Sequence, residues 1–164
     1  MLDTMASHGI NYCRIFLDMP PWSLEPRISG QYDAEGAETL VRFLTATGRR
    51  GIRVMVCLEH FRDIQPSSSN APRAVNPWFQ RPMHHRDHGG PYNGMEAYLN
   101  SEAGVAQFNR KLAFLRKRCG DRPEVFAWEL WNEMDCVEGD WLAWTKRTLP
   151  EVHQIGRASC RERV

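Results

Sequence analysis

The sequence has no long apolar run and no concentration of charge of one sign. No stretch approaches the roughly 18 consecutive apolar residues of a membrane-spanning helix. Lysine and arginine total 21 against 20 aspartates and glutamates, which gives a net charge of +1, and the basic residues form no clustered face. Neither a membrane nor a nucleic acid is therefore an expected partner.

The chain also lacks a glycine-rich phosphate-binding motif and a regular cysteine pattern. No such glycine motif follows a predicted strand, which weakens the case for a nucleotide-binding Rossmann fold. Of the five cysteines, the four before the last ten residues have spacings that fit neither a zinc ribbon nor a dense disulfide scaffold: Cys13, Cys57, Cys119 and Cys136. Cys13 and Cys57 fall in predicted strands and are interpreted as small buried apolar residues. No cofactor is predicted.

The 164 residues, 42% of them hydrophobic, have the size of one globular domain. The last ten, residues 155–164, resemble the translation of a sequencing adapter and show no apolar periodicity, so the predicted domain covers residues 1–154. A native basic tail is the alternative. If the tail is an artefact, the chain is expected to be a fragment and Met1 an internal methionine. The cellular location then stays open, secretion being one option.

The most informative stretch runs from Val125 to Glu133. Its first seven residues are apolar or aromatic except Glu129, it has strand length, and it follows a breaker at residues 121–123. One interpretation is a reactive carboxylate held at the rim of a buried sheet. The other is a core strand whose final Asn132-Glu133 only caps the next turn.

Strand-like and helix-like segments alternate along the rest of the chain. Apolar runs predict strands over residues 10–17, 52–58 and 125–131, and helical periodicity predicts helices over 2–8, 33–47, 101–118 and 140–153. Gly9 is placed to end the first helix, and Asp33, Ser101 and Asp140 to cap the others. Polar residues 61 to 100 predict a long functional loop. The alternation predicts a parallel sheet, either doubly wound or part of a (β/α)8 barrel.

Polar side chains lie at or toward the carboxyl ends of all three predicted strands. They are Arg14, Glu59 with His60, and Asn132 with Glu133. In (β/α)8 barrels this edge holds the active site. Each residue also has a structural alternative: Arg14 could pair with Glu129, His60 could be a loop histidine, and Asn132 could cap the backbone.

The segment Trp128-Glu129-Leu130-Trp131-Asn132-Glu133 resembles the end of the fourth strand in clan A retaining glycoside hydrolases, most closely the cellulase family, glycoside hydrolase family 5. Residues 9–14 resemble that family's second strand, and residues 51–60 resemble its third strand. Residues 30–33 also fit the segment before its second helix. The match covers nearly all of residues 2–153. The resemblance implies a partial (β/α)8 barrel holding about strands 2–4 with flanking helices.

The resemblance also implies roles at matching positions. Glu133 would be the general acid/base, and Asn132 would bond the 2-hydroxyl of a poly- or oligosaccharide. Arg14 would support the nucleophile and His60 would line the subsite beside the cleaved bond. Retaining hydrolysis needs two carboxyl groups about 5–5.5 Å apart, one to protonate the leaving oxygen and one to attack. Trp128 and Trp131 are expected to surround Glu133 and to favour its protonated form, and Trp131 is also expected to contact the substrate.

The family's nucleophile is a glutamate at the end of the seventh strand, which this sequence does not reach. The chain by itself is therefore expected to be an inactive fragment of a hydrolase. Aromatic side chains predicted beyond strand ends are candidates for stacking on sugar rings: Trp22, Trp78, Phe79 and Tyr92. Trp141 and Trp144, at helical spacing, are predicted to be core residues.

Two other functions compete with this interpretation. His84, His85 and His88 lie within five residues and could bind zinc, but Pro82 and Gly89 predict a loop, not the helix that would bring His84 and His88 together. A barrel that binds carbohydrate without cleaving it is the second alternative. The sequence predicts no particular glycan.

Overall fold

The computed structural model describes residues 1–17, 19–60, 64, 83–134 and 138–157. Helices and strands alternate as predicted. In chain order they are α1 (Leu2–Ser7), β1 (Tyr12–Phe16), α2 (Ala34–Gly48), β2 (Arg53–Cys57), η3 (Arg86–His88), α3 (Met95–Leu99), α4 (Glu102–Cys119), β3 (Val125–Glu129) and α5 (Trp141–Arg157).

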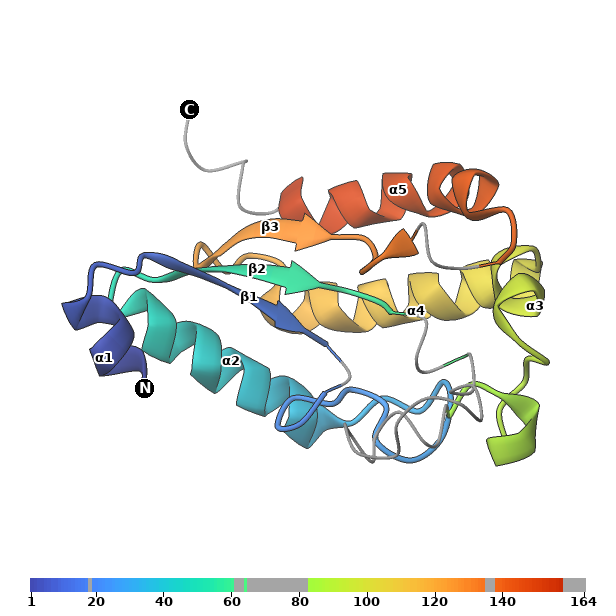
Figure 1. Cartoon of the computed structure of the whole chain (residues 1–164), viewed down its shortest axis with the longest axis horizontal. Coiled ribbons are helices and arrows are strands. Elements are labelled where there is room, and N and C mark those ends of the chain that lie inside the picture. The colour runs from blue at the N-terminus through green and yellow to red at the C-terminus, as the bar shows by residue number, and fades with distance from the viewer. Residues whose placement is uncertain (18, 61–63, 65–82, 135–137, 158–164) are drawn as a thin grey trace.

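The three strands form one parallel sheet in the order β1-β2-β3. All three run in the same direction, so their carboxyl ends meet at one edge. In Figure 1 the sheet lies in front of α4, between α2 and α5. A doubly wound sheet carries helices on both faces. The described helices that pack on this sheet cover one face, which is the arrangement in a (β/α)8 barrel wall.

Side-chain caps fix where the long helices begin. The Asp33 carboxylate accepts hydrogen bonds from two backbone N–H groups at the start of α2. Ser101 Oγ accepts from Gly104 N at 3.1 Å, and Asp140 Oδ1 accepts from Ala143 N at 2.9 Å. Gly9 has a φ of 75°, the left-handed conformation predicted for the end of α1. The four helix-end predictions are confirmed.

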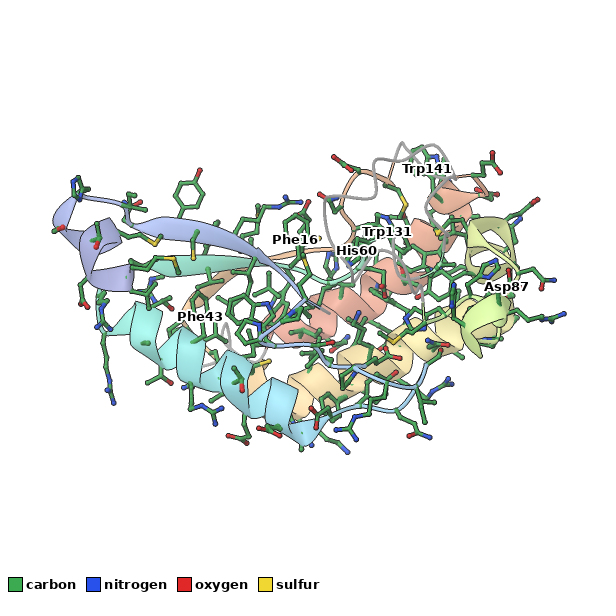
Figure 2. All side chains as sticks on the ribbon, turned by 60° about the horizontal axis from the view of Figure 1, so that its bottom comes forward. Phe16, Phe43, His60, Asp87, Trp131 and Trp141 are labelled. Atoms are coloured by element: carbon green, nitrogen blue, oxygen red, sulfur yellow. The ribbon has the colours of Figure 1, made fainter. Side chains whose placement is uncertain are left out.

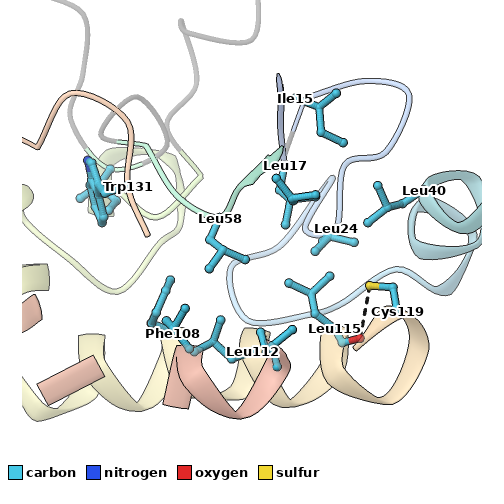
Figure 3. Packing of buried hydrophobic residues seen from close by; sticks show 14 of the residues in the cluster. Ile15, Leu17, Leu24, Leu40, Leu58, Phe108, Leu112, Leu115, Cys119 and Trp131 are labelled. Atoms are coloured by element: carbon cyan, nitrogen blue, oxygen red, sulfur yellow. Dashed lines mark hydrogen bonds between the residues drawn. The ribbon is translucent and has the colours of Figure 1, made fainter. Parts of the chain in front are cut away.

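The hydrophobic core lies between the sheet and the helices. Ile15 and Leu58 meet Leu40 of α2 and Leu112 of α4 there (Figure 3). The opposite face of the sheet, which we call the open face, carries Tyr12 and Phe126, 60% and 53% exposed, with ring centroids 6.0 Å apart. Parallel sheets are normally covered on both faces.

The strands are shorter than predicted. The first begins at Tyr12 because Ile10 N donates a hydrogen bond to Met5 O of α1 instead of joining the sheet. The long loop predicted over residues 61–100 is also wrong in part, because η3 and α3 lie within it. Tyr98 and Leu99 of α3 are buried, so this segment helps to build the core.

The last helix differs from prediction in the exposure of Trp141 and in where it ends. Trp144 is buried as predicted, but Trp141 is 41% exposed and lies at the outer margin of the molecule (Figure 2). Trp141 is the first residue of α5, directly after the Asp140 cap. The helix also continues to Arg157, and Ile155 is completely buried in the core. The helix therefore crosses the predicted boundary at residue 154, and Ile155 belongs to the core.

Candidate active site

The carboxyl ends of the strands converge as predicted. His60 and Asn132 form a parallel bridge beyond β2 and β3, and Asn132 N donates to Glu59 O at 3.0 Å. His60 and Trp131 are both buried, 5% exposed each, and both are labelled in Figure 2. Backbone pairing thus continues past the ends of both strands and brings His60 together with the Asn132-Glu133 pair.

Arg14 of β1 connects this edge to β3. Its Nε and Nη2 donate to the two carboxylate oxygens of Glu129 at 2.6 and 2.7 Å, and Nη2 also donates to Asn132 Oδ1 at 2.8 Å. The guanidinium lies over the Phe16 ring, 4.5 Å from its centroid. The hydrogen bond to Glu129 raises the pKa of Arg14, against the opposing effect of partial burial. The ion pair with Glu129, the structural alternative for Arg14, is therefore present.

Glu133 is exposed and has a φ of 52°. It is the one non-glycine residue with positive φ among the described residues, a conformation that costs about 1–2 kcal/mol. Backbone strain of this kind is concentrated at functional sites. Because Glu133 projects from a left-handed turn directly after the His60–Asn132 bridge, it has access to solvent at the edge where the strand ends meet.

Trp131 does not surround Glu133 as expected. It is 5% exposed and packs in the core, with its ring centroid 5.2 Å from that of Trp144 and 6.1 Å from that of Tyr98. Successive side chains in an extended chain point to opposite sides. Asn132 reaches Arg14 on the open face, whereas Trp131 turns toward the helices and packs in the core.

A second polar cluster lies on the helix side of the same edge. Lys111 Nζ of α4 is 3.3 Å from Glu59 Oε2, and Tyr98 OH donates to the same oxygen at 3.5 Å. Burial raises the pKa of Tyr98 well above its ordinary value, so the phenol keeps its proton. The sequence reasoning missed Lys111. The available signal was a charged residue on the buried stripe that also carries Phe108 and Leu115, because a buried charge requires a partner.

The aromatic residues proposed for sugar stacking have different positions. Trp22 packs against Phe43 of α2 at 4.6 Å, and its Nε1 donates to Phe16 O at 2.7 Å. Tyr92 is 5% exposed and its hydroxyl donates to Gln107 Oε1, so it is a core residue and the stacking prediction for it is wrong. Its hydroxyl needs that partner because it is buried. Trp78 and Phe79 lie outside the described residues.

The three histidines of the proposed metal site have separate environments. His84 is buried, and its Nδ1 lies 2.7 Å from Ser29 Oγ and 3.0 Å from Gln107 Nε2. His85 Nε2 lies 3.0 Å from Asn93 O, and His88 is exposed in η3. Within the described ranges, no group of three His, Cys, Asp or Glu side chains could hold a metal ion. None of the described helices is long and apolar enough to cross a membrane.

No family model and no curated protein matches the sequence, but the fold is similar to several solved structures. The exo-beta-1,4-mannosidase Op5Man5 from Opitutaceae bacterium strain TAV5 matches 94% of this chain and 25% of its own length, with 22% identity and a TM-score of 0.63. GH5_18 from Streptomyces cattleya, solved with GlcNAc, matches 94% of this chain and 35% of its own at 18% identity, with a TM-score of 0.61.

A third similar structure is endo-glycoceramidase II from Rhodococcus sp., with 18% identity and a TM-score of 0.56 over 93% of this chain and 40% of that one. The chain therefore spans 25–40% of the length of these three proteins. All three are glycoside hydrolases, as the sequence resemblance predicted. The chain has the fold of part of a (β/α)8 barrel.

Proposed function

We propose that the chain carries the acid/base half of the active site of a retaining β-glycosidase that cleaves O-glycosidic bonds in poly- or oligosaccharides. The observation that carries the proposal is the link between strand ends. Arg14 of β1 holds Asn132 at 2.8 Å, and Asn132 is bridged to His60. Glu133 follows at once, exposed and in a left-handed conformation.

Each residue has a defined task in this reaction. Glu133 donates a proton to the leaving oxygen and then removes one from the attacking water. Asn132 bonds the sugar 2-hydroxyl, and this bond strengthens as positive charge develops at the anomeric carbon. His60 lines the subsite beside the cleaved bond.

The second carboxylate is assigned to a part of the protein outside this chain. Glu129 is the nearest carboxylate in sequence within the described residues, but both of its oxygens accept hydrogen bonds from Arg14. We therefore expect the 164-residue chain alone to hydrolyse no glycoside, and turnover of an aryl β-glycoside by the purified chain would contradict this.

The acid/base role is tested in the intact protein encoded by the full-length gene. Glu133→Ala should lower kcat/KM by about 10²–10⁴ on glycosides with poor leaving groups and much less on activated aryl glycosides, which need little protonation. Added azide should restore turnover, because a small anion can replace the base-assisted water. The control Glu138→Ala changes an exposed glutamate close in sequence. Equal losses on both substrate classes would exclude Glu133 as the acid/base, and binding without hydrolysis by the intact wild type would favour the non-catalytic alternative.

A further inference from the structure

The Arg14 guanidinium is held by three hydrogen bonds. Its Nε–H and both Nη2–H groups are directed to the two Glu129 oxygens and to Asn132 Oδ1. Both parallel bonds to Glu129 must break before the guanidinium can rotate, so Glu129 fixes its plane. The Arg14 side chain is 32% exposed.

The same contact decides which way the Asn132 amide faces. Arginine donates hydrogen bonds and accepts none, so the atom of Asn132 next to Nη2 has to be the oxygen. The amide nitrogen then lies on the other side of the side chain and makes no hydrogen bond to any residue in the described ranges. Without the arginine contact the amide could adopt either orientation, because its last torsion has two broad, similar minima.

The backbone at Asn132 does not depend on Glu129. Asn132 N is bonded to Glu59 O at 3.0 Å and the residue is bridged to His60, both on β2. Changing Glu129 should therefore alter the orientation of the Arg14 and Asn132 side chains more than the position of the chain. This separation makes a positioning role distinguishable from a structural one.

We propose that Glu129 is a positioning residue, which holds Arg14 so that Asn132 presents its amide nitrogen to the substrate as a hydrogen-bond donor. This inference rests on the proposed glycosidase function for its substrate, a glycoside whose C2 hydroxyl oxygen accepts that hydrogen bond. The site then prefers a substrate with an acceptor at C2 over its 2-deoxy analogue, and Glu129 sets the size of that preference through Arg14.

The first test uses the 164-residue chain itself and does not require activity. NMR hydrogen exchange of the Arg14 Nε–H proton should be slow in the wild type and at least about tenfold faster in Glu129→Gln, because an amide cannot accept two parallel bonds from the guanidinium. Glu38→Gln, an exposed change on α2, is the matched control and should leave the exchange rate unchanged. Exchange in the wild type as fast as in free arginine would overturn the proposal.

The second test uses the intact protein and compares aryl β-glycosides with and without the 2-hydroxyl. Glu129→Gln should reduce the ratio of kcat/KM values between the two substrates about tenfold, the value of one well-oriented hydrogen bond. In an Asn132→Ala background the same change should leave the ratio unaltered. Comparing the variants cancels the different intrinsic reactivities of the two glycosides.

The outcomes separate the two hypotheses. A fall in activity on both substrates by the same factor would mean that Glu129 acts on stability alone, which would overturn the positioning role while leaving the glycosidase function intact. Absence of turnover by the intact wild type would overturn the proposed function and the substrate part of the inference. The exchange measurement on the chain would then still decide whether Glu129 orders Arg14.

Discussion

Two ion pairs lie at the same edge of the sheet, one on each face, and they have opposite characters. Glu59 and Lys111, on the helix side, are 3.3 Å apart with side chains 3% and 1% exposed. Arg14 and Glu129, on the open face, are 2.6 Å apart but 32% and 27% exposed. The longer contact is the one on which folding should depend, because its members have no access to water if the pair is broken.

The difference follows from the central position of β2. Its carboxyl end leads into the space filled by α3 and α4, where Glu59 meets both Lys111 and Tyr98. Arg14 and Glu129 belong to the two outer strands and reach across β2 on the face without described helices. We conclude that the ion pair on the helix side of this edge stabilises the fold, whereas the ion pair on the open face remains accessible to solvent and to a ligand.

The largest expected effect comes from breaking the buried pair. Lys111→Met should lower the free energy of unfolding by about 3–5 kcal/mol, because it removes a buried charge that is paired with the Glu59 carboxylate. Urea denaturation of the chain measures this loss. Lys117→Met, an exposed change on the same helix, should cost less than about 0.5 kcal/mol. A loss below about 1 kcal/mol for Lys111→Met would remove the distinction between the two pairs.

Apolar side chains should follow the same division between the faces. Leu58→Ala removes a completely buried side chain on the helix side and should cost about 2–5 kcal/mol. Phe126→Ala on the open face, where the ring is 53% exposed, should cost less than about 1 kcal/mol. Denaturation midpoints of the two variants give the comparison, and similar losses would show that the open face is covered in solution.

The pair on the open face should contribute little to stability. Glu129→Gln is expected to cost no more than about 1 kcal/mol, because water can solvate Arg14 once its partner is neutral. Thermal unfolding measures this, with Arg147→Gln as a matched disruption of the exposed Arg147–Glu102 pair. A loss of about 3 kcal/mol or more would place Glu129 among the residues required for folding and would weaken its positioning role.

Two buried tyrosines, Tyr92 and Tyr98, should make the stability of the fold depend on pH only in alkaline solution. Burial raises the pKa of Tyr92 to about 12 and that of Tyr98 well above its ordinary value. Well below pH 10 both phenols are protonated in the folded and the unfolded chain, so their contribution to the free energy of unfolding is fully present and does not change with pH. Above pH 10 the unfolded chain loses these protons first, and stability should fall as the pH rises toward 12.

This alkaline loss can be measured by urea denaturation at several pH values. Cys57 and Cys119 contribute in the same direction, because burial raises the pKa of each thiol to about 12. Tyr92→Phe should reduce the loss between pH 10 and 12. A stability that is flat to pH 12 would contradict the burial of these phenols.

Much of this architecture was predictable because it depends on neighbours in sequence. The apolar runs placed the three strands to within a few residues, and the capping residues Asp33, Ser101 and Asp140 placed the helix starts. The alternation of strand-like and helix-like segments predicted that the strands form a parallel sheet. The convergence of Arg14, His60 and Asn132 also followed, since parallel strands bring their carboxyl ends to a common edge.

The parts that could not be predicted involve residues far apart in the chain. Lys111 pairs with Glu59 across 52 positions, and no periodicity identifies which buried charge meets which. The sequence pattern also assigned Trp131 to the site, whereas the structure turns it toward Trp144 in the core. Ile155 was excluded with the tail, yet it is buried because α5 continues past residue 154.

The sequence by itself determined the kinds of element, their order and the edge at which polar groups gather, because hydrogen bonding and side-chain period act over a few residues. Tertiary structure alone decided which face each side chain occupies. Packing against α3, α4 and α5 took Glu59 and Trp131 to the helix side. Arg14, Glu129 and Asn132 were left together on the open face, where water and a ligand can reach them.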